Sequence, residues 1–558
     1  MKLSNVLLAG VAALALVSCG KKDKAADGPQ SETSAQAAKA QAGSPLDAKF
    51  SLKDAEPVDV DAFLALFPDD SRPTYETAAF DKSLGATVVQ NLRFADADDG
   101  EAVTVARAEF FGLDLDALER VRSAEGVGAD APFETIFDKV RLHDVASEVV
   151  DEGDESVTLT IGGVEFDKLQ LRQGGVDGDG AGDEGARFFN AVNLAGIYFK
   201  DFSVATDAPG SPGVVMNAPD LRFVGIGGGK LGAMIANNLQ YEVAQSPESL
   251  AAMSAAMGPQ AAVFLSGPLA GFIAPEQQQV KMKSLEWRNI DFSGLLAWGL
   301  KGEAPPMTET KLINLGTMKA AEMQTFINGK RAATVAEATM SAGEFTWLAP
   351  SNLRFDSKGV VYDFTAYVPA TEEAALKALK DHGLDNVKGA GGAAWVWNSK
   401  SGAADFNYTA TMEKVADINA AFGFSNLKLA EMAAAIEDGE TDAVLNQGAL
   451  KNFSLEVKDE KALDAIFALA ALQMGGTGAD LRQSAPAMIR LTGAQAAQMN
   501  PRIAGYVNAV ADFISKGGSL NIAAAPAEPV AFTALQATSE AAPQTLPDVI
   551  DLKVTHKQ

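Results

Sequence analysis

Three aspartates in a glycine-rich stretch are the residues whose types best suit chemistry. Asp177, Asp179 and Asp183 lie within residues 174–185, where glycine recurs at nearly every second position. Carboxylate oxygens on such a loop are ligands that Ca²⁺ prefers. The spacing departs from an EF-hand loop, because the twelfth position counted from Asp177 is Phe188 and not an acid. The stretch therefore predicts either a calcium site or a solvated acidic loop. The acidic residues within 96–101 leave the same two interpretations open.

Two pairs of carboxylates occupy matching places, Glu109 with Asp114 and Glu286 with Asp291. Two carboxylates can divide acid and base roles in catalysis. We interpret them as structural, because each aspartate precedes a turn that it can cap and each glutamate falls on the polar face of a strand. The three histidines are far apart, and no Gly-x-Ser-x-Gly nucleophile elbow occurs. Apart from the calcium alternative, the sequence predicts no cofactor and no catalytic residue, and hence no enzyme.

All five tryptophans fall between residues 287 and 397. Trp395 and Trp397 are expected to share one face of a strand, because side chains alternate along it. With Trp287 they could line an apolar groove for acyl chains, or stack on sugar rings. Core packing is the more usual role of aromatic strand residues, so ligand contact at these three tryptophans is a hypothesis.

The charge balance excludes several classes of partner. The chain has 558 residues, with 46 Lys and Arg against 73 Asp and Glu, and a formal net charge of −27. Nucleic acid is not expected as a partner, because binding to phosphates needs a basic footprint. The hydrophobic fraction of 47% is that of a globular protein. A single cysteine excludes an internal disulfide framework and any cysteine-cluster metal site.

The N-terminal segment indicates where the protein resides. The apolar run from residue 5 to 17 is too short to span a bilayer but suits the core of a signal peptide. It ends in Leu16-Val17-Ser18-Cys19, which resembles the lipobox of bacterial lipoproteins. The resemblance implies removal of residues 1–18 as a signal peptide and lipidation of Cys19, by diacylglycerol and a further acyl chain such as palmitate. The alternative is an ordinary secretory signal with a chance cysteine.

Residues 19–48 are predicted to form a flexible tether. They are rich in Ala, Ser, Gly, Gln and Lys, and cannot bury enough apolar surface to fold. Two or three acyl chains on Cys19 give stable membrane anchoring. Gly20 stands where an aspartate favours inner-membrane retention in enteric bacteria. We therefore expect a protein anchored to the outer membrane through Cys19, with its body facing the periplasm or the cell surface.

The periodicity of the remaining chain predicts an α+β fold. Alternating β-branched and aromatic residues predict strands, and apolar residues at helical spacing predict helices mainly in the C-terminal half. The clearest strands are expected at 103–110, 156–161, 394–397 and 406–411, and the clearest helices at 371–384, 459–474 and 485–516, the last broken at Pro501. We expect repeated strand units that form extended antiparallel sheets.

An internal repeat divides the chain. Residues 103–118 match residues 280–295 at an offset of 177, as a strand that runs into a turn and a short helix. Repeats of one supersecondary unit build extended sheets; chance similarity between amphipathic strands is the alternative. We predict a strand-rich repeat domain at 49–245, a helical connection at 246–278 and a second α+β repeat domain at 279–558.

The repeated pattern Val-x-Val-x-x-x-Glu-aromatic-x-Gly-Leu-Asp-Leu is similar to strand units of AsmA-like bacterial envelope proteins. The terminal run from Gly517 to Pro547 is likewise similar to the ends of uncharacterised alphaproteobacterial exported proteins. The resemblance implies a long curved sheet with an apolar face and a role in lipid or outer-membrane homeostasis. It implies no catalytic residue.

Three functions remain open on the sequence. The first is a non-enzymatic envelope lipoprotein that binds or shields a hydrophobic ligand, with lipid as the expected ligand. The second is a structural or interaction scaffold of the outer membrane with an envelope protein partner. The third is a calcium-assisted hydrolase, which depends only on the acidic loops.

Overall fold

The structure is a computed structural model that describes a large part of the chain. The described residues are 45–67, 72–95, 102–123, 131–148, 156–173, 184–207, 211–246, 248–249, 251, 275–346, 349–440 and 442–558. They form an α+β fold of antiparallel strands, with helices mostly in the C-terminal half, as the periodicity predicts. No helix among them is long and apolar enough to cross a membrane.

The chain divides into two compact units at residues other than those predicted. The first unit comprises residues 1–252, 279–305 and 312–318, and the second comprises 253–278, 306–311 and 319–558. Residues 279–305, which contain the second copy of the repeat, therefore belong with the first unit. The reason is packing, because Met282 and Leu285 of that copy contact the buried residues Ala218 and Ala236.

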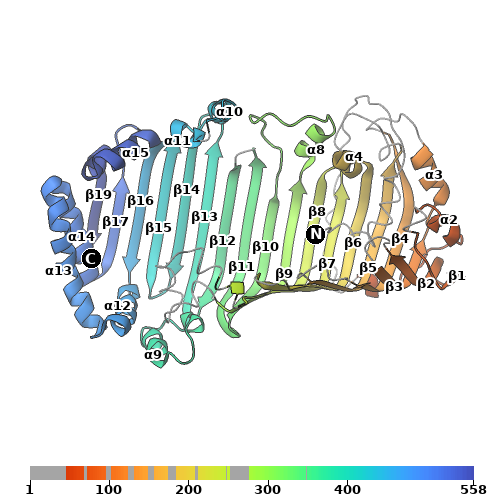
Figure 1. Cartoon of the computed structure of the whole chain (residues 1–558), viewed down its shortest axis with the longest axis horizontal. Helices are drawn as coiled ribbons and strands as arrows, with labels where there is room; N and C mark the ends of the chain where they lie inside the picture. The colour runs from red at the N-terminus through yellow and green to blue at the C-terminus, as the bar shows by residue number, and fades with distance from the viewer. Residues whose placement is uncertain are drawn as a thin grey trace. The chain divides into compact units, whose positions relative to one another are not determined.

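The first unit contains a sheet in which neighbours in sequence pair antiparallel (Figure 1). Its strands are β1 (Thr77–Asp81), β2 (Ala86–Ala95), β3 (Ala102–Phe111), β4 (Phe133–Glu148), β5 (Ser156–Arg172), β6 (Val192–Asp207), β7 (Gly213–Gly227), β8 (Lys230–Ala244) and β9 (Gln277–Asp291). Its helices are η1 (Pro45–Asp47), α2 (Val60–Leu64), α3 (Leu115–Ser123), α4 (Glu184–Ala191) and α8 (Ser293–Gly299). The main core lies where α2 and α3 pack against β2 to β6.

The second unit continues the same up-and-down pattern. Its strands are β10 (Gly316–Ile327), β11 (Lys330–Phe345), β12 (Pro350–Tyr362), β13 (Val387–Asn398), β14 (Ala403–Met412), β15 (Ala416–Ser425), β16 (Ala449–Asp459), β17 (Gly518–Ala524), β18 (Val530–Ala531) and β19 (Leu552–Lys557). Its helices are η2 (Phe364–Tyr367), α9 (Glu373–Asp381), α10 (Leu429–Glu437), α11 (Ala443–Gln447), α12 (Ala462–Met474), α13 (Gly478–Met499), α14 (Pro501–Lys516), α15 (Phe532–Ala541), η3 (Pro543–Thr545) and α16 (Leu546–Val549). β17 pairs with both β16 and β19.

The helices predicted at 371–384, 459–474 and 485–516 are confirmed, and local chemistry explains several of their ends. Most of the predicted helical connection at 246–278 lies outside the described residues. Helix α12 stops at Gly475, whose φ of 78° is easily reached only without a Cβ. Asn500 caps α14, because its side-chain oxygen accepts a hydrogen bond from the Arg502 amide at 3.0 Å. Pro501 then occupies the first helical position, where its missing N–H costs nothing. Helix α13 begins earlier than predicted, at Gly478.

A row of left-handed residues crosses the first unit's sheet. Asn91, Asp144, Asp201 and Asn238 have φ between 52° and 54° and lie on every second strand from β2 to β8. The pairs that flank them place all four in one lateral row. Irregular residues inside strands bend them and re-aim their side chains. Strands of this unit turn out of the plane of the view near their lower ends (Figure 1).

Candidate functional site

An apolar face on the second unit's sheet is the strongest candidate for a binding site. Strand register aligns side chains from five successive strands in two lateral rows. The first row is Leu353, Trp395, Phe406, Phe422 and Phe453, and the second is Phe355, Ala393, Tyr408, Ala420 and Leu455. We call these ten residues together with Phe424 the aromatic face. Ile522 of β17 and Val554 of β19 extend the second row.

The rings of the aromatic face contact one another from strand to strand. The ring centroid of Phe422 lies 6.0 Å from that of Phe406 and 4.9 Å from that of Phe453. Phe424 lies 6.4 Å from Trp395 and 5.9 Å from Phe532 of α15. Edge-on and offset pairs at these distances are favourable beyond the area that they bury. The contacts therefore make a continuous aromatic surface and not isolated side chains.

The aromatic face is only partly covered. Leu353, Phe355 and Tyr408 are 37%, 41% and 39% exposed, although all three are large side chains. The opposite face of the same strands is polar, as shown by the exposed Asn407 and Thr409 of β14. Antiparallel sheets commonly pack one face and solvate the other. Here the apolar face of the described residues is left partly open to solvent.

Small residues on β13 widen the space between the large side chains. Gly389, Gly391 and Ala393 alternate along this strand on the side of the aromatic face. Register places Ala393 between Phe355 of β12 and Tyr408 of β14. A strip of β13 without large side chains therefore runs between two exposed rings, where an extended apolar chain could lie.

Helices border the aromatic face at the strand ends and along one edge (Figure 1). α9 and α12 pack at one end, where Ala375, Leu379 and Ala465 join a core with Val387 and Ala416. α10 packs at the other end, in a cluster that includes Trp397. Along the outer edge, α14 packs against β17 and β19, and the Phe513 ring lies 6.5 Å from that of His556.

The three tryptophans predicted to contact a ligand occupy different environments. Trp395 and Trp397 do share one face of β13, as the alternation predicts. Trp395 is half-buried within the aromatic face, and its indole N–H donates to the Pro350 carbonyl at 3.0 Å. Trp397 is 5% exposed and donates to the Leu427 carbonyl at 2.8 Å, so it is a core residue. Trp287 belongs to the first unit and donates to the Leu315 carbonyl.

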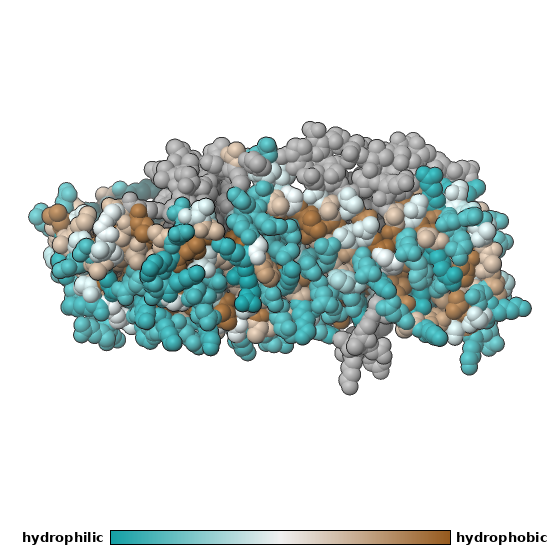
Figure 2. Space-filling model, turned by 90° about the horizontal axis from the view of Figure 1, so that it is seen from below, coloured by the Kyte–Doolittle hydropathy of each residue, from teal (hydrophilic) through white to brown (hydrophobic). Residues whose placement is uncertain are grey.

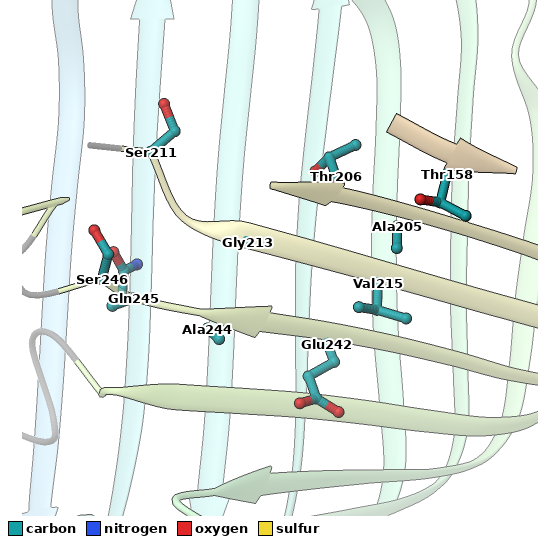
Figure 3. Close-up of a pocket in the computed structure, with 10 residues that line it drawn as sticks. All are labelled: Thr158, Ala205, Thr206, Ser211, Gly213, Val215, Glu242, Ala244, Gln245 and Ser246. Atoms are coloured by element: carbon teal, nitrogen blue, oxygen red, sulfur yellow. The ribbon is translucent and has the colours of Figure 1, made fainter. Parts of the chain in front are cut away.

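An open pocket of about 430 Å³ lies at the ends of β5 to β8 in the first unit (Figure 3). Its lining includes the hydroxyls of Thr158, Thr206 and Ser211, and Glu242 is its one charged lining residue. The Glu242 carboxylate accepts a hydrogen bond from the Gln279 amide at 2.9 Å.

A ladder of charged side chains crosses the first unit's sheet. Register aligns Glu109, Arg141, Glu165, Tyr198 and Arg222 on successive strands from β3 to β7. Glu165 is 2% exposed, and its two oxygens accept from Lys139 Nζ at 2.5 Å and from Arg141 Nε at 2.7 Å. Buried charges persist in a fold when they are paired in this way. We call this row together with Lys139 the charged ladder.

The N-terminal segment at residues 45–50 lies across the charged ladder. Arg141 donates to the carbonyls of Pro45 and Ala48 at 3.2 and 3.0 Å. The Phe50 ring lies beneath Lys139 Nζ at 5.0 Å, and Asp47 pairs with Lys200 at 2.6 Å. The ladder therefore fixes the start of the described chain to the sheet, which is a structural role.

The paired carboxylates of the repeat serve the structure. Asp114 accepts from the Ala117 amide and Asp291 from the Ser293 amide, both at 2.8 Å, so both aspartates cap the turns that they precede. Glu109 lies in the charged ladder and is buried, at 6% exposed. Burial by itself would raise the pKa of Glu109, but nearby His143 and Arg107 outweigh it and hold the pKa below its usual range.

The pKa of Asp291 is also held below its usual range. Burial by itself would raise this pKa. Hydrogen bonds from Ser293 and the positive charge of Lys230, whose Nζ lies 3.2 Å from the carboxylate, lower the pKa by more than burial raises it.

The predicted calcium ligands Asp177, Asp179 and Asp183 lie outside the described residues, as do residues 96–101. Among the residues that the structure describes, no cluster of metal-ligating side chains occurs.

Sequence reasoning selected the tryptophans and missed most of the aromatic face. Phe355, Phe406, Phe422 and Phe453 were not singled out, although Phe406-x-Tyr408 places two aromatic residues on one face of a predicted strand and Phe422-x-Phe424 has the same spacing. That alternation is the signal that could have found them. Only the register shows that these pairs lie side by side.

The comparisons with known proteins identify no function. Residues 409–557 match a family model described as an uncharacterised protein. The matched segment begins in β14 and ends in β19, so it contains the helices α10 to α16 and five of the eleven residues of the aromatic face. Leu353, Phe355 and Tyr408 lie before it. No curated protein matches the chain.

Proposed function

We propose that this protein is a non-enzymatic envelope lipoprotein whose second unit binds or shields the acyl chains of a lipid on the aromatic face. The observation that carries the proposal is the partial exposure of Leu353, Phe355 and Tyr408 on an otherwise apolar sheet face. Covering these side chains would stabilise a complex by roughly 1 kcal/mol for each. The lipidated Cys19 expected from the sequence would keep the protein beside its ligand.

The dimensions of the aromatic face suit an acyl chain. The seven strands from β12 to β17 and β19 span roughly 29 Å, because neighbouring strands lie about 4.8 Å apart. One leaflet of a bilayer is about 15 Å of hydrocarbon, half of the ~30 Å core. A phospholipid could therefore lay its chains across several strands, between the flanking helices.

The polar surroundings favour an amphipathic ligand over a purely apolar one. The side of the molecule shown in Figure 2 is mostly hydrophilic, with separate apolar patches. A lipid headgroup could remain in this hydrated surface while the chains contact the sheet. The contact between the aromatic face and an acyl chain needs no specific polar partner, so the face would accept acyl chains of different length.

The test is native mass spectrometry of residues 20–558, which include every described residue, after gentle purification from the periplasm. We expect phospholipid at near-integer stoichiometry. The double variant Phe355→Glu/Tyr408→Glu should lose it, because both side chains are exposed and flank the small residues of β13. The matched control is Val396→Glu, which is 54% exposed on the opposite face of the same sheet. Lipid-free wild type, or equal loss in both variants, would refute the proposal.

A further inference from the structure

Helix α13 presents an apolar stripe to solvent. Met488, Leu491 and Met499 are 65%, 78% and 59% exposed. Helical periodicity places Ser484 and Gln495 on the same side of α13 as these three residues, because each of the five positions is three or four residues from the next. The neighbouring helix α12 also exposes apolar side chains, which are Ile466, Leu472 and Met474. We call the side of α13 that carries Ser484, Met488, Leu491, Gln495 and Met499 the neutral face.

No charge lies on the neutral face. From Leu481 to Pro501 the chain has only two charged residues, Arg482 and Arg490, although 21% of the whole chain is charged. Both arginines point to other helices. Arg482 pairs with Asp464 of α12 and donates to the Ile514 carbonyl at 2.8 Å, and Arg490 pairs with Asp512 of α14 at 2.9 Å.

The other side of α13 packs against α14, which borders the aromatic face. A Cβ on Gly493 would fall 2.4 Å from a methyl group of Val507, so the two helices approach closely there. α14 in turn contacts β19, where the Tyr506 hydroxyl donates to the Leu552 carbonyl. The neutral face is thus separated from the edge of the aromatic face by one helix.

The chemistry of the neutral face fits a zwitterionic membrane surface. Interfacial helices that bind anionic lipid carry a rim of Lys and Arg beside their apolar face, and α13 has no such rim. The cores of protein interfaces are enriched in aromatic residues. The exposed apolar side chains of α12 and α13 include no aromatic ring, so a second copy of this chain fits less well.

We propose that α13 docks its neutral face on a zwitterionic lipid bilayer and so brings the edge of the aromatic face next to the lipid. This inference rests on the proposed lipid function. Met488, Leu491 and Met499 enter the boundary between headgroups and acyl chains, while Arg482 and Arg490 stay in their ion pairs. The net charge of −27 keeps the rest of the surface away from anionic lipid.

The test is flotation of residues 20–558, which lack the lipid anchor, with phosphatidylcholine vesicles. We expect reversible binding that weakens when phosphatidylglycerol is added. Met488→Glu/Leu491→Glu should lower the partition coefficient at least about tenfold, because it places two charges at the interface. The matched control is Val444→Glu/Leu445→Glu on α11, where the two side chains are 46% and 48% exposed.

Two readouts separate this proposal from the proposed function. The α13 variant should keep its co-purified phospholipid in native mass spectrometry, and Phe355→Glu/Tyr408→Glu should lose phospholipid while still floating with vesicles. Wild type that retains phospholipid but does not float would overturn the docking and leave the lipid function standing. A concentration-dependent dimer that the α13 variant abolishes would overturn the docking and assign the neutral face to a second copy of this chain. Equal loss of flotation in the α11 control would also overturn the docking.

Discussion

At the scale of single residues, Glu165 is a buried carboxylate that pairs with two cations in the first unit. It is buried and its carboxylate neutralises Lys139 and Arg141. We predict that Glu165→Ala lowers the free energy of unfolding by about 3 kcal/mol, because Arg141 loses its carboxylate partner and Lys139 keeps only the partly exposed Asp167, at 3.3 Å. Arg354→Ala, which removes an exposed pair with Asp356, should leave the urea midpoint unchanged. A small effect of Glu165→Ala would mean that the buried pair is not formed in solution.

Glu109 should make the stability of the first unit depend on acid. Its pKa is lowered in the folded state, so its contribution is present above the usual glutamate pKa of about 4.3 and is lost as the pH falls through the lower folded value. We expect the urea midpoint to fall as the pH is taken below about 4. Glu109→Gln should flatten this dependence. An unchanged slope in the variant would show that Glu109 does not contribute.

At the scale of elements, the left-handed row shapes the long strands of the first unit. Asp144 of β4 is exposed and has a φ of 52°. Its side chain therefore contributes little packing, and the left-handed backbone conformation determines which residues fit at this position. We predict that Asp144→Val destabilises by about 1–2 kcal/mol, because a β-branched residue disfavours this region. Asp144→Gly should be neutral or stabilising. Chemical denaturation of both variants checks this, and equal effects would contradict it.

The elements also explain why part of the sequence reasoning succeeded. Thr477 caps the start of α13 and Asn500 caps that of α14, and α12 and α14 end at Gly475 and Gly517, so residues close in sequence determine these helix ends. The strand that runs into a short helix at 103–118 and at 280–295 is likewise local, and both copies form it, as β3 with α3 and β9 with α8. α10 and α15 were not predicted.

At the scale of the whole molecule, we predict that a lipid anchor at Cys19 controls where the protein resides. Cys19 is the only cysteine, and it lies outside the described residues. We predict that Cys19→Ser abolishes incorporation of labelled palmitate and moves the protein out of the membrane fraction, because one weakly bound face cannot replace two or three acyl chains. Palmitate labelling with membrane fractionation measures both effects. A wild type that takes up no label would contradict the lipobox assignment.

By itself the sequence determined the α+β class, the antiparallel strands and the helices α9, α12, α13 and α14, since periodicity, caps and turns act over a few residues. It also showed a strongly acidic chain without a basic footprint. The tertiary structure decided which side chains meet. Leu353, Phe406 and Phe453 lie far apart in sequence, and only the pairing of β12 to β16 aligns them in one row. Strand alternation assigns a residue to one of two faces, but register and neighbouring helices decide whether that face is covered. For this reason Trp397 is buried while Phe355 and Tyr408 remain exposed.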